Sequence, residues 1–522
     1  MARRHNKVVF KDYHQHQGWL LPPSLDEMIA ATHPVRTIND ILDSIDITLL
    51  IKAYKGGGSS AYHPRMLLKL LVYGYISNIY SSRRLEEAAK TNIHFLWLTG
   101  SEMPDHHTIN RFRGERLAGA LRPIFTQVVT LLCEEGLLSI KELFIDGTKI
   151  ESAAGRYTFV WGKSVATNRE KIKKQIDELW AYARKVAAEE LEGPEPPEFT
   201  PVDSQKVKET VAKIEAALKG KEGVDKKVQA KLAAAKRNWP AALDKYSGQE
   251  RILAGRSSYS KTDPDATFMR MKEDHMGNGQ LKPAYNVQLS TNNQYIADYS
   301  IHPNPGDSLT LAGHLQQLET DYGTGAVAVV TADAGYGSEQ NYELLEGKGI
   351  TAFVKYNTFD GEQKEKEDPK QPLKAADLYY NSEKDHYICP MGQVMARAGT
   401  FKKVTAGRYE QTITTYRAGR CEGCPLRGVC YKGKAECREI EINHNLNRHR
   451  TKARELLCSE EGIRRRKQRG VDVEPAIGNI KSNHGFRRFL LRGNEKVEIE
   501  TGLLSLAHNL RKRTAAKMKE AA

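Results

Sequence analysis

The chain has 522 residues, a length that favours two to four domains over a single core. Lys and Arg outnumber Asp and Glu by 79 to 65, and the net charge of +14 favours a polyanionic partner. No run of about 18 apolar residues occurs, which argues against a membrane span. The start, "MARRHNKVVFKDYHQHQGWLLPPS", lacks the apolar core of a secretory signal. We therefore expect a soluble intracellular protein.

Residues 1–135 are expected to form a helical domain. After Pro64, "RMLLKLLVYGYISNIY" has apolar residues at helical spacing, and "SSRRLEEAAK" follows as a second helix with serines at its N-cap. A third helix begins in "PDHHTINRFRGERL", where Asp105 suits the N-cap and Arg111 and Arg113 lie near the first turns. Three short helices with a basic last member are compatible with a DNA-reading helix-turn-helix, although most three-helix bundles bind no DNA.

The stretch "ELFIDGTKIES", residues 142–152, reads as a strand with an aspartate inside it. An ionised carboxylate out of water costs several kcal/mol unless a positive charge compensates it. Asp146 is therefore either a residue of a turn that ends the strand or a ligand of a metal ion.

Two inserts interrupt the rest of the chain. Charged amphipathic helices in residues 163–258 predict a helical hairpin, and residues 358–480 combine short strands, cysteines and a basic stretch. Outside the inserts, the predicted order is three strands, a helix, a strand, a helix, a strand and a terminal helix. This is the order of an RNase-H-like fold, so we predict an α/β protein with a mixed sheet. Its core would consist of residues 136–162, 259–357 and 481–522.

In an RNase-H-like fold, metal-binding carboxylates lie on the first strand, just after the fourth strand, and on the helix after the fifth. Here those places hold Asp146, Asp333 and a glutamate near residue 500.

Three glutamates compete for the third place: Glu495, Glu498 and Glu500. Glu500 is preferred because residues three, four and seven positions on are apolar, whereas those after Glu498 suit a solvent face. Glu339 is a distant alternative, since the helix dipole alone explains a glutamate in a first turn.

Six blocks of the sequence together resemble the bacterial insertion-sequence transposases of the DDE class that carry a helical N-terminal domain. They occur in order over almost the whole chain: "YHPRMLLKLLVYGY", "SSRRLEEAAK", "PDHHTINRFR", "FIDGTKIES", "TADAGYGSEQN" and "GLLSLAHNLRK". The resemblance implies an RNase-H-like catalytic core with Asp146, Asp333 and Glu500 as its acidic triad. It also implies a cytoplasmic, nucleoid-associated homodimer that binds terminal inverted repeats and target DNA.

A triad of this kind suits cleavage and transfer of DNA strands. Two Mg²⁺ or Mn²⁺ ions about 4 Å apart can stabilise both the attacking and the leaving oxygen of a phosphodiester, and hard cations prefer carboxylate oxygens. The alternatives are a non-catalytic DNA-binding regulator derived from a transposase and a metal nuclease without strand transfer. The presence of all three carboxylates argues against a decayed enzyme.

Five of the seven cysteines lie between Cys389 and Cys437, a clustering that indicates metal rather than disulfides. A CxxC pair with two further cysteines fits the tetrahedral thiolate site of a structural Zn²⁺. The preferred ligands are Cys389, Cys421, Cys424 and Cys430. Cys437 can replace one of them, and a set of reduced, partly buried thiols remains the alternative.

Basic residues late in the chain are expected to contact DNA phosphates, which would position DNA without reading its sequence. Between Arg448 and Gly470, nine Lys or Arg face three Glu. The predicted DNA contacts outside the N-terminal domain are Arg464, Arg465, Arg466, Lys467, Arg469, Arg487, Arg488, Arg492 and Lys496. The families that this chain resembles often have an arginine and a tyrosine before the triad glutamate, and these two residues have no clean counterpart here. Lys496 or Arg492 is expected to contact the phosphate instead. Tyr157 and Trp161 are candidates for stacking on an unpaired base, although packing is the commoner role.

Overall fold

The computed structural model describes residues 20–54, 60–187, 203–221, 223–271, 279–364 and 373–520, and also Gln15. The chain divides into two compact units, Met1–Arg113 with Arg513–Ala522, and Gly114–Lys512. The first unit is shorter than the predicted helical domain of residues 1–135, because α7 (Leu121–Glu134) belongs to the second unit.

The first unit is helical, as predicted. Its helices are α1 (Pro34–Ser44), α2 (Thr48–Lys52), α3 (Pro64–Ile76), α4 (Ser82–Thr91), α5 (Ile93–Thr99) and α6 (His106–Arg111). Proline occupies the first helical position of α1 and α3, where its missing N–H costs nothing. At α6 the Asp105 carboxylate accepts the N–H of Thr108 at 2.7 Å, which confirms the predicted N-cap.

A mixed sheet forms the centre of the second unit. Its strands are β1 (Glu142–Glu151), β4 (Thr267–Arg270), β5 (Leu281–Asn292), β6 (Tyr295–His302), β7 (Val329–Ala332) and β8 (Thr351–Val354). One edge of β5 pairs with β1 and its other edge with β4 and β6, all antiparallel. β1, β7 and β8 then follow as parallel neighbours. β5 and β6 form a hairpin, and Asn293 and Gln294 both take the positive φ of its tight turn.

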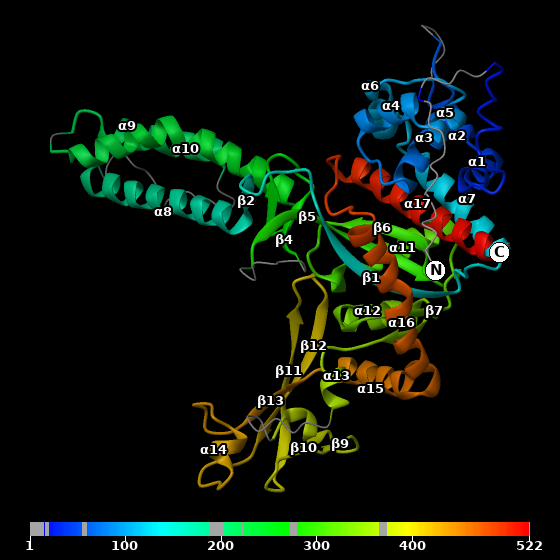
Figure 1. Cartoon of the computed structure of the whole chain (residues 1–522). Coiled ribbons are helices and arrows are strands. Elements are labelled where there is room, and N and C mark those ends of the chain that lie inside the picture. The colour runs from blue at the N-terminus through cyan, green and yellow to red at the C-terminus, as the bar shows by residue number, and fades with distance from the viewer. Residues whose placement is uncertain are drawn as a thin grey trace, which may run out of the picture. The chain divides into compact units, whose positions relative to one another are not determined.

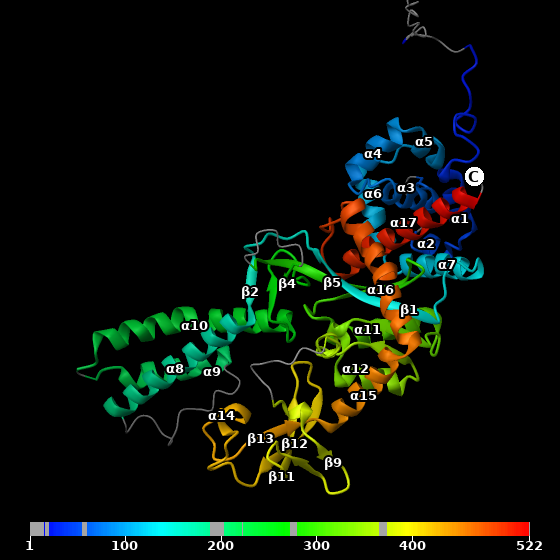
Figure 2. The same cartoon turned by 60° about the horizontal axis from the view of Figure 1, so that its bottom comes forward.

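Helices cover the sheet on both faces (Figures 1 and 2). α11 (Leu311–Tyr322) packs against β6 and α12 (Glu339–Gly347) against β8. α16 (Glu460–Gly478) packs against β1, β5 and β7. Asp146 and Gly147 are successive residues of β1 and face opposite sides, Asp146 toward α16 and Gly147 toward the turn η3 (Asp307–Leu309) before α11. α16 and the start of α11 therefore lie on opposite faces.

The position of α16 differs from the prediction. Its residues fall in the stretch 358–480, which the sequence indicated as an insert because it is polar, cysteine-containing and basic. The terminal helix is α17 (Asn494–Glu520), on which the predicted apolar positions Ile499, Leu503 and Leu506 are buried. The ring of His508 on the same helix is also buried, and it bonds the Gln294 carbonyl at 2.8 Å.

The first insert is a bundle of three helices rather than a hairpin (Figure 1). α8 (Gly162–Val186), α9 (Ser204–Leu218) and α10 (Lys226–Leu253) share an apolar core that includes Ile176, Val211 and Ala235. Gly220 and Gly223 have positive φ, and Asp225 caps the helix that follows them. The charged run, which reads as one helix in the sequence, is therefore divided into two helices at these residues. The proline-rich link at residues 192–201 lies outside the described residues. The short strands β2 (Phe159–Trp161) and β3 (Ser258–Ser260) pair beside the bundle's ends.

The second insert is a five-stranded antiparallel sheet in the order β13-β12-β11-β10-β9. Its strands are β9 (Tyr380–Asn381), β10 (His386–Ile388), β11 (Val394–Val404), β12 (Glu410–Ala418) and β13 (Glu439–Ile442). Short helices α13 (Phe359–Glu362) and α14 (Arg427–Cys430) accompany it, and α15 (His444–Cys458) leads into α16. In the described ranges, no single helix is both long and apolar enough to cross a membrane, whereas one sharply bent pair, His106–Arg116 with Leu121–Glu134, passes the same test when taken together.

The buried histidine of α11 predicts a pH dependence of stability. Burial lowers the pKa of His314 to about 3, and its two ring nitrogens bond the hydroxyls of Ser290 and Ser300. The unfolded chain takes up this proton near pH 6.5, so stability is complete above that pH and falls as pH drops toward the folded pKa, by about 1.4 kcal/mol per pH unit. Urea unfolding at pH 7 and pH 5 should therefore show a smaller loss in His314→Gln than in the wild type. His107→Gln, a change at an exposed histidine, is the control, and equal losses in all three proteins would contradict the assignment.

Candidate active site

Parallel pairing of β1 with β7 places Asp146 and Asp333 side by side. Ile145 is in register with Ala332, and the two aspartates are the next residues of their chains. Asp146 is buried and its Oδ1 accepts the N–H of Gly147 at 2.8 Å. Asp333 caps the turn η4 (Ala334–Tyr336), where its Oδ1 accepts the N–H of Gly335 at 2.8 Å. Each carboxylate thus has one oxygen fixed by its own backbone and the second oxygen available to a cation.

The cation in the structure is the guanidinium of Arg469 on α16. Its Nη2 lies 2.9 Å from Asp146 Oδ2 and 3.6 Å from Asp333 Oδ2. Its Nη1 lies 3.7 Å from Oε1 of Glu474, one turn further along α16. The Arg469 side chain is only 15% exposed, so these ion pairs are poorly screened by solvent. Three carboxylates from β1, the end of β7 and α16 are joined through this one side chain.

A further carboxylate, Asp307, lies at the other side of β1. Its Oδ1 accepts N–H bonds from Asn286 at 2.8 Å and from Gln288 at 3.1 Å. A Cβ atom on Gly147 would lie 2.4 Å from the same Oδ1, and one on Gly335 would lie 3.4 Å from Oδ2. Asp307 is not among the site residues predicted from the sequence. The sequence signal for Asp307 was the pair of glycines, Gly147 and Gly335, that follow the two site aspartates. A residue without a side chain permits another side chain to approach the backbone closely.

Tyr336 forms the buried floor beside these carboxylates. Its hydroxyl donates to Oε1 of Gln288. Burial raises the pKa of the Tyr336 phenol well above its usual range, and the charges of Asp307, Asp146 and Asp333 raise it further. Burial and the nearby carboxylates therefore favour the neutral phenol, the form that donates to Gln288.

Glu500, the glutamate preferred from the sequence, is fully buried on α17. Its Oε2 accepts the backbone N–H groups of Leu490 at 2.9 Å and Leu491 at 2.8 Å. A buried carboxylate used in this way holds the loop before α17 in place, which is a structural role.

The other glutamates weighed from the sequence also have structural partners. Glu498 accepts Arg122 Nε at 2.8 Å. Glu339 is buried and accepts side-chain amide N–H groups from Gln411, Asn443 and Asn445, which attach α12 to the second insert. Glu495 is exposed in the first turn of α17.

Four of the five clustered cysteines line one small cavity of about 20 Å³: Cys389, Cys421, Cys424 and Cys430. Backbone N–H groups of Gln393 and Arg438 each lie 3.4 Å from a thiol sulfur, those of Cys389 and Cys421 respectively. The Arg438 guanidinium approaches Cys430 Sγ at 2.9 Å. Cys437 instead bonds the Gly419 carbonyl and does not line the cavity. The structure therefore separates the four preferred cysteines from the fifth.

No group of three or more His, Cys, Asp or Glu side chains among the described residues is arranged to hold a metal ion as it stands. This holds for the carboxylates around Arg469 and for the four thiols. Metal binding at either place would require side chains to move closer together.

Of the basic residues predicted to contact DNA, two are buried, two are partly buried and the rest are exposed. The partly buried ones are Arg466 and Arg469, and Arg469 pairs with Asp146 and Asp333 instead of being free for a phosphate. Arg113 and Arg465 are buried: Arg113 donates to the Tyr80 carbonyl, and Arg465 pairs with Glu142 and Glu461. These two serve the interior. The remaining exposed residues are Arg111, Arg464, Lys467, Arg487, Arg488, Arg492 and Lys496.

The arginines before α17 are attached to the loop after β1. Arg488 donates to the carbonyls of Ser152 and Ala154, both at 3.0 Å, and Arg492 donates to that of Ala153 at 3.0 Å. Both side chains are exposed, so part of each guanidinium still faces solvent. This places positive charge just beyond the strand that carries Asp146.

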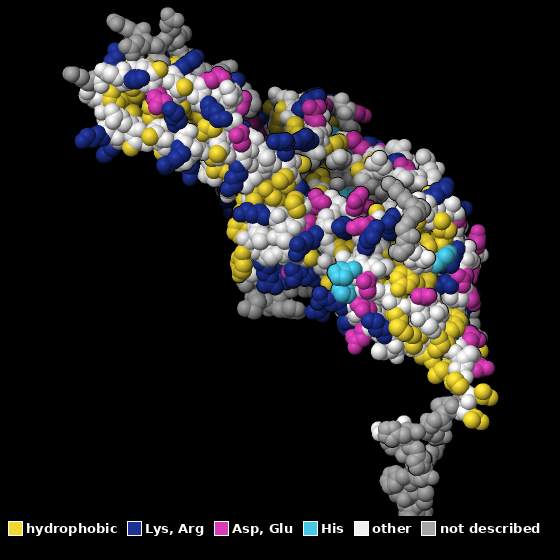
Figure 3. Space-filling view, turned by 90° about the horizontal axis from the view of Figure 1, so that it is seen from above, with side chains coloured by type: hydrophobic (Ala, Val, Ile, Leu, Met, Phe, Trp, Pro, Cys, Tyr) yellow, Lys and Arg dark blue, Asp and Glu magenta, His cyan; other side chains and the backbone are white. Residues whose placement is uncertain are grey.

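Other predicted contacts are less distinctive. Arg466 is half-buried with its guanidinium over the Phe359 ring. Tyr157 is 84% exposed, as stacking on a base would need, whereas Trp161 packs with Phe159 and Phe268. On the α8–α10 bundle, Lys and Arg side chains are interspersed with acidic ones (Figure 3), which is the pattern of a solvated helical surface.

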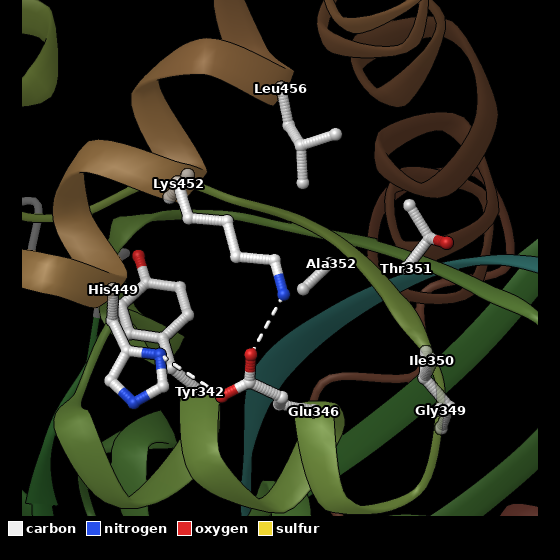
Figure 4. Close-up of a pocket in the computed structure, with 10 residues that line it drawn as sticks. Tyr342, Glu346, Gly349, Ile350, Thr351, Ala352, His449, Lys452 and Leu456 are labelled. Carbon is white, nitrogen blue, oxygen red and sulfur yellow. Dashed lines mark hydrogen bonds and ion pairs between the residues drawn. The ribbon is translucent and has the colours of Figure 1, made fainter.

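A pocket of about 300 Å³ lies between α12, β8 and α15, apart from the residues around Arg469 (Figure 4). Glu346 projects into it and pairs with Lys452 at 2.8 Å, with His449 on the other side. Hydrogen bonds from Lys452 and Arg448 lower the pKa of Glu346 to about 2. Glu346 is thus paired with basic side chains, and the residues that line the pocket do not suggest a catalytic role.

Two family models match the chain. Residues 388–514 match a model described as a transposase DDE domain, and residues 23–115 match a transposase domain (DUF772). Both matches support an insertion-sequence DDE transposase. The first match includes the cysteines, α16 and most of α17, whereas Asp146 and Asp333 lie outside both. No curated protein and no solved structure gives a significant match to the chain.

The absence of a side chain at residue 147 makes a testable prediction about stability. Gly147→Ala would bring Cβ within 2.4 Å of both Asp307 Oδ1 and Gln288 Nε2, so we expect a loss of about 1–3 kcal/mol of unfolding free energy. Gly306→Ala is the matched control, because nothing lies within 4 Å of its added Cβ. Denaturant unfolding of the two variants measures the difference, and equal stabilities would show that Asp307 does not approach β1 this closely.

Proposed function

We propose that the protein binds the ends of a mobile element and catalyses metal-dependent DNA cleavage and strand transfer. The observation that carries the proposal is the register of β1 and β7, which makes Asp146 and Asp333 neighbours on two inner strands of the sheet. The strand order β6-β5-β1-β7-β8, with parallel pairing only from β1 onward, supports an RNase-H-like core.

The residues around Arg469 fit a divalent cation by their chemistry. Asp146 and Asp333 already share one cationic nitrogen through their Oδ2 atoms, and Mg²⁺ or Mn²⁺ prefers such oxygens. The metal supplies activation of the attacking hydroxyl or water and stabilisation of the leaving 3′ oxygen. The protein supplies the fixed carboxylates, with the exposed arginines before α17 holding DNA phosphates.

We assign the third carboxylate to Glu474 rather than to Glu500. Glu474 is 63% exposed on the helix that crosses β1 and β7, and it reaches the same arginine as the two aspartates. Glu500 is enclosed and accepts two backbone N–H groups. An exposed carboxylate can turn to a metal ion at little cost, whereas withdrawing Glu500 would leave two N–H groups unpaired.

Cleavage assays test the assignment. A labelled duplex carrying the element's own end is incubated with Mg²⁺ or Mn²⁺ and with wild-type protein, Asp146→Asn, Glu474→Gln or Glu500→Gln. We expect nicking by the wild type and a loss of about a hundredfold or more in Asp146→Asn and Glu474→Gln, with DNA binding retained. Glu500→Gln should instead lower the melting temperature.

Three outcomes would change the proposal. Binding without cleavage by the wild type favours the non-catalytic regulator. Nicking without joining of the cut end to target DNA indicates a nuclease. Loss of cleavage in a well-folded Glu500→Gln, with Glu474→Gln active, returns the third place to Glu500. Two ends must be joined in one reaction, so the expected assembly on DNA is a homodimer.

We further propose that the second insert holds a structural Zn²⁺ through the four cysteines of the 20 Å³ cavity. Thiols in this number, with backbone N–H groups directed at two of the sulfurs, suit tetrahedral zinc.

Metal analysis tests the zinc site independently of DNA cleavage. Purified protein should contain about one Zn²⁺ per chain, and Cys424→Ser should lose it and unfold at a lower temperature. Cys437→Ser is the matched control because Cys437 does not line the cavity. Zinc-free wild-type protein with unchanged stability would overturn the proposal, as would zinc loss in Cys437→Ser alone.

A further inference from the structure

The most unusual group at the candidate site is a cation, not a carboxylate. Nη2 of Arg469 lies within 4 Å of Oδ2 of both Asp146 and Asp333, at 2.9 and 3.6 Å. These oxygens differ from the Oδ1 atoms, each of which accepts a neighbouring backbone N–H. Asp146 and Asp333 would hold a divalent cation through their carboxylates, so the ion pairs with Arg469 would compete with metal binding.

We propose that Arg469 is an internal counter-ion that holds Asp146 and Asp333 together in the metal-free protein and must withdraw when a divalent cation binds. The inference rests on the proposed function, because it takes the two aspartates as metal ligands. Arg469 then sets the metal affinity of the site, since each binding event has to break its ion pairs.

The local charge explains why a counter-ion is needed. Asp146, Asp333 and Asp307 surround Tyr336, and two of them are buried at least in part within the sheet. Negative charges that lie close together repel one another strongly when water is excluded. The guanidinium of Arg469 lowers this repulsion because it pairs with both Asp146 and Asp333.

The environment of Arg469 also permits it to leave. Its Nε is buried without a hydrogen-bond partner among the described residues, so the present position is not fully satisfied. Glu474 lies 3.7 Å from Nη1 and is itself exposed, which offers the guanidinium a partner nearer to solvent. Arginine has a long flexible stem, so the headgroup can move while α16 stays in place.

Metal binding without DNA tests the inference. Mn²⁺ affinity is measured by electron paramagnetic resonance or calorimetry, and the melting temperature is measured in EDTA. Arg469→Gln should bind Mn²⁺ about ten- to hundredfold more tightly than the wild type, the range expected when a charge-assisted bond need not be broken. It should also melt at a lower temperature in EDTA, because the aspartates lose their counter-ion.

Two further variants separate the local effect from other causes. Arg464→Gln removes the same charge from the same helix, at an exposed position where Arg464 pairs with Glu461. It should leave Mn²⁺ affinity within about twofold of the wild type. Arg469→Lys keeps the charge and should stay close to the wild type, which guards against the case where Arg469→Gln does not fold. Affinity in Arg469→Gln no greater than in Arg464→Gln would overturn the inference, as would affinity in Arg469→Lys as high as that expected for the glutamine variant.

Asp146→Asn distinguishes this failure from a failure of the proposed function. If Asp146→Asn binds Mn²⁺ as well as the wild type, the aspartates are not the metal site and both proposals fall. If Asp146→Asn loses Mn²⁺ and Arg469→Gln gains no affinity, the metal site stands and only the counter-ion role of Arg469 is wrong.

Discussion

Two aspartates placed next to one another at the centre of a sheet impose the main constraint on this fold. Asp146 is 6% exposed, and its neighbour Asp333 ends the adjacent strand, so their charges are incompletely solvated. Such a pair is tolerated only with hydrogen bonds to each carboxylate and a positive charge nearby. The chain supplies both, the first from the N–H groups of Gly147 and Gly335 and the second from Arg469.

The need for that positive charge fixes the course of α16. The helix is attached to the sheet at both ends of its contact: Arg465 pairs with Glu142 at the start of β1, and Asp472 accepts the hydroxyl of Thr291 at 2.7 Å and the N–H of Gln294 at 3.1 Å. Between these two contacts, Arg469 lies over Asp146 in β1 and Asp333 at the end of β7. The basic composition of α16 therefore serves the interior of the protein as much as its surface.

The sequence predicts the proximity of Asp146 and Asp333 because both signals are local. Each aspartate follows apolar strand residues and precedes glycine or a glycine-rich turn, and parallel neighbours bring such ends together. The third acidic position is harder, because it depends on which helix crosses the sheet. α16 reads as a charged stretch within an insert, whereas α17 shows the regular apolar spacing of a core helix, so spacing favours Glu500. Burial of Glu500 was predicted correctly, but its partners are backbone N–H groups, which side-chain periodicity cannot reveal.

The charge balance at the site indicates why Arg469 is a sufficient counter-ion for folding but not a permanent one. Asp146, Asp333 and Asp307 together carry three negative charges around Tyr336, and Glu474 adds a fourth at the edge, against the single charge of Arg469. A region left this negative attracts cations of higher charge, and a divalent ion compensates it better than a guanidinium from a smaller volume. Under the proposed function, the same excess of negative charge would repel a DNA phosphate, so DNA binding and metal binding would reinforce one another. The exposed arginines on the loop before α17, which bond the loop after β1, would then hold the phosphates until the charge at the aspartates is balanced.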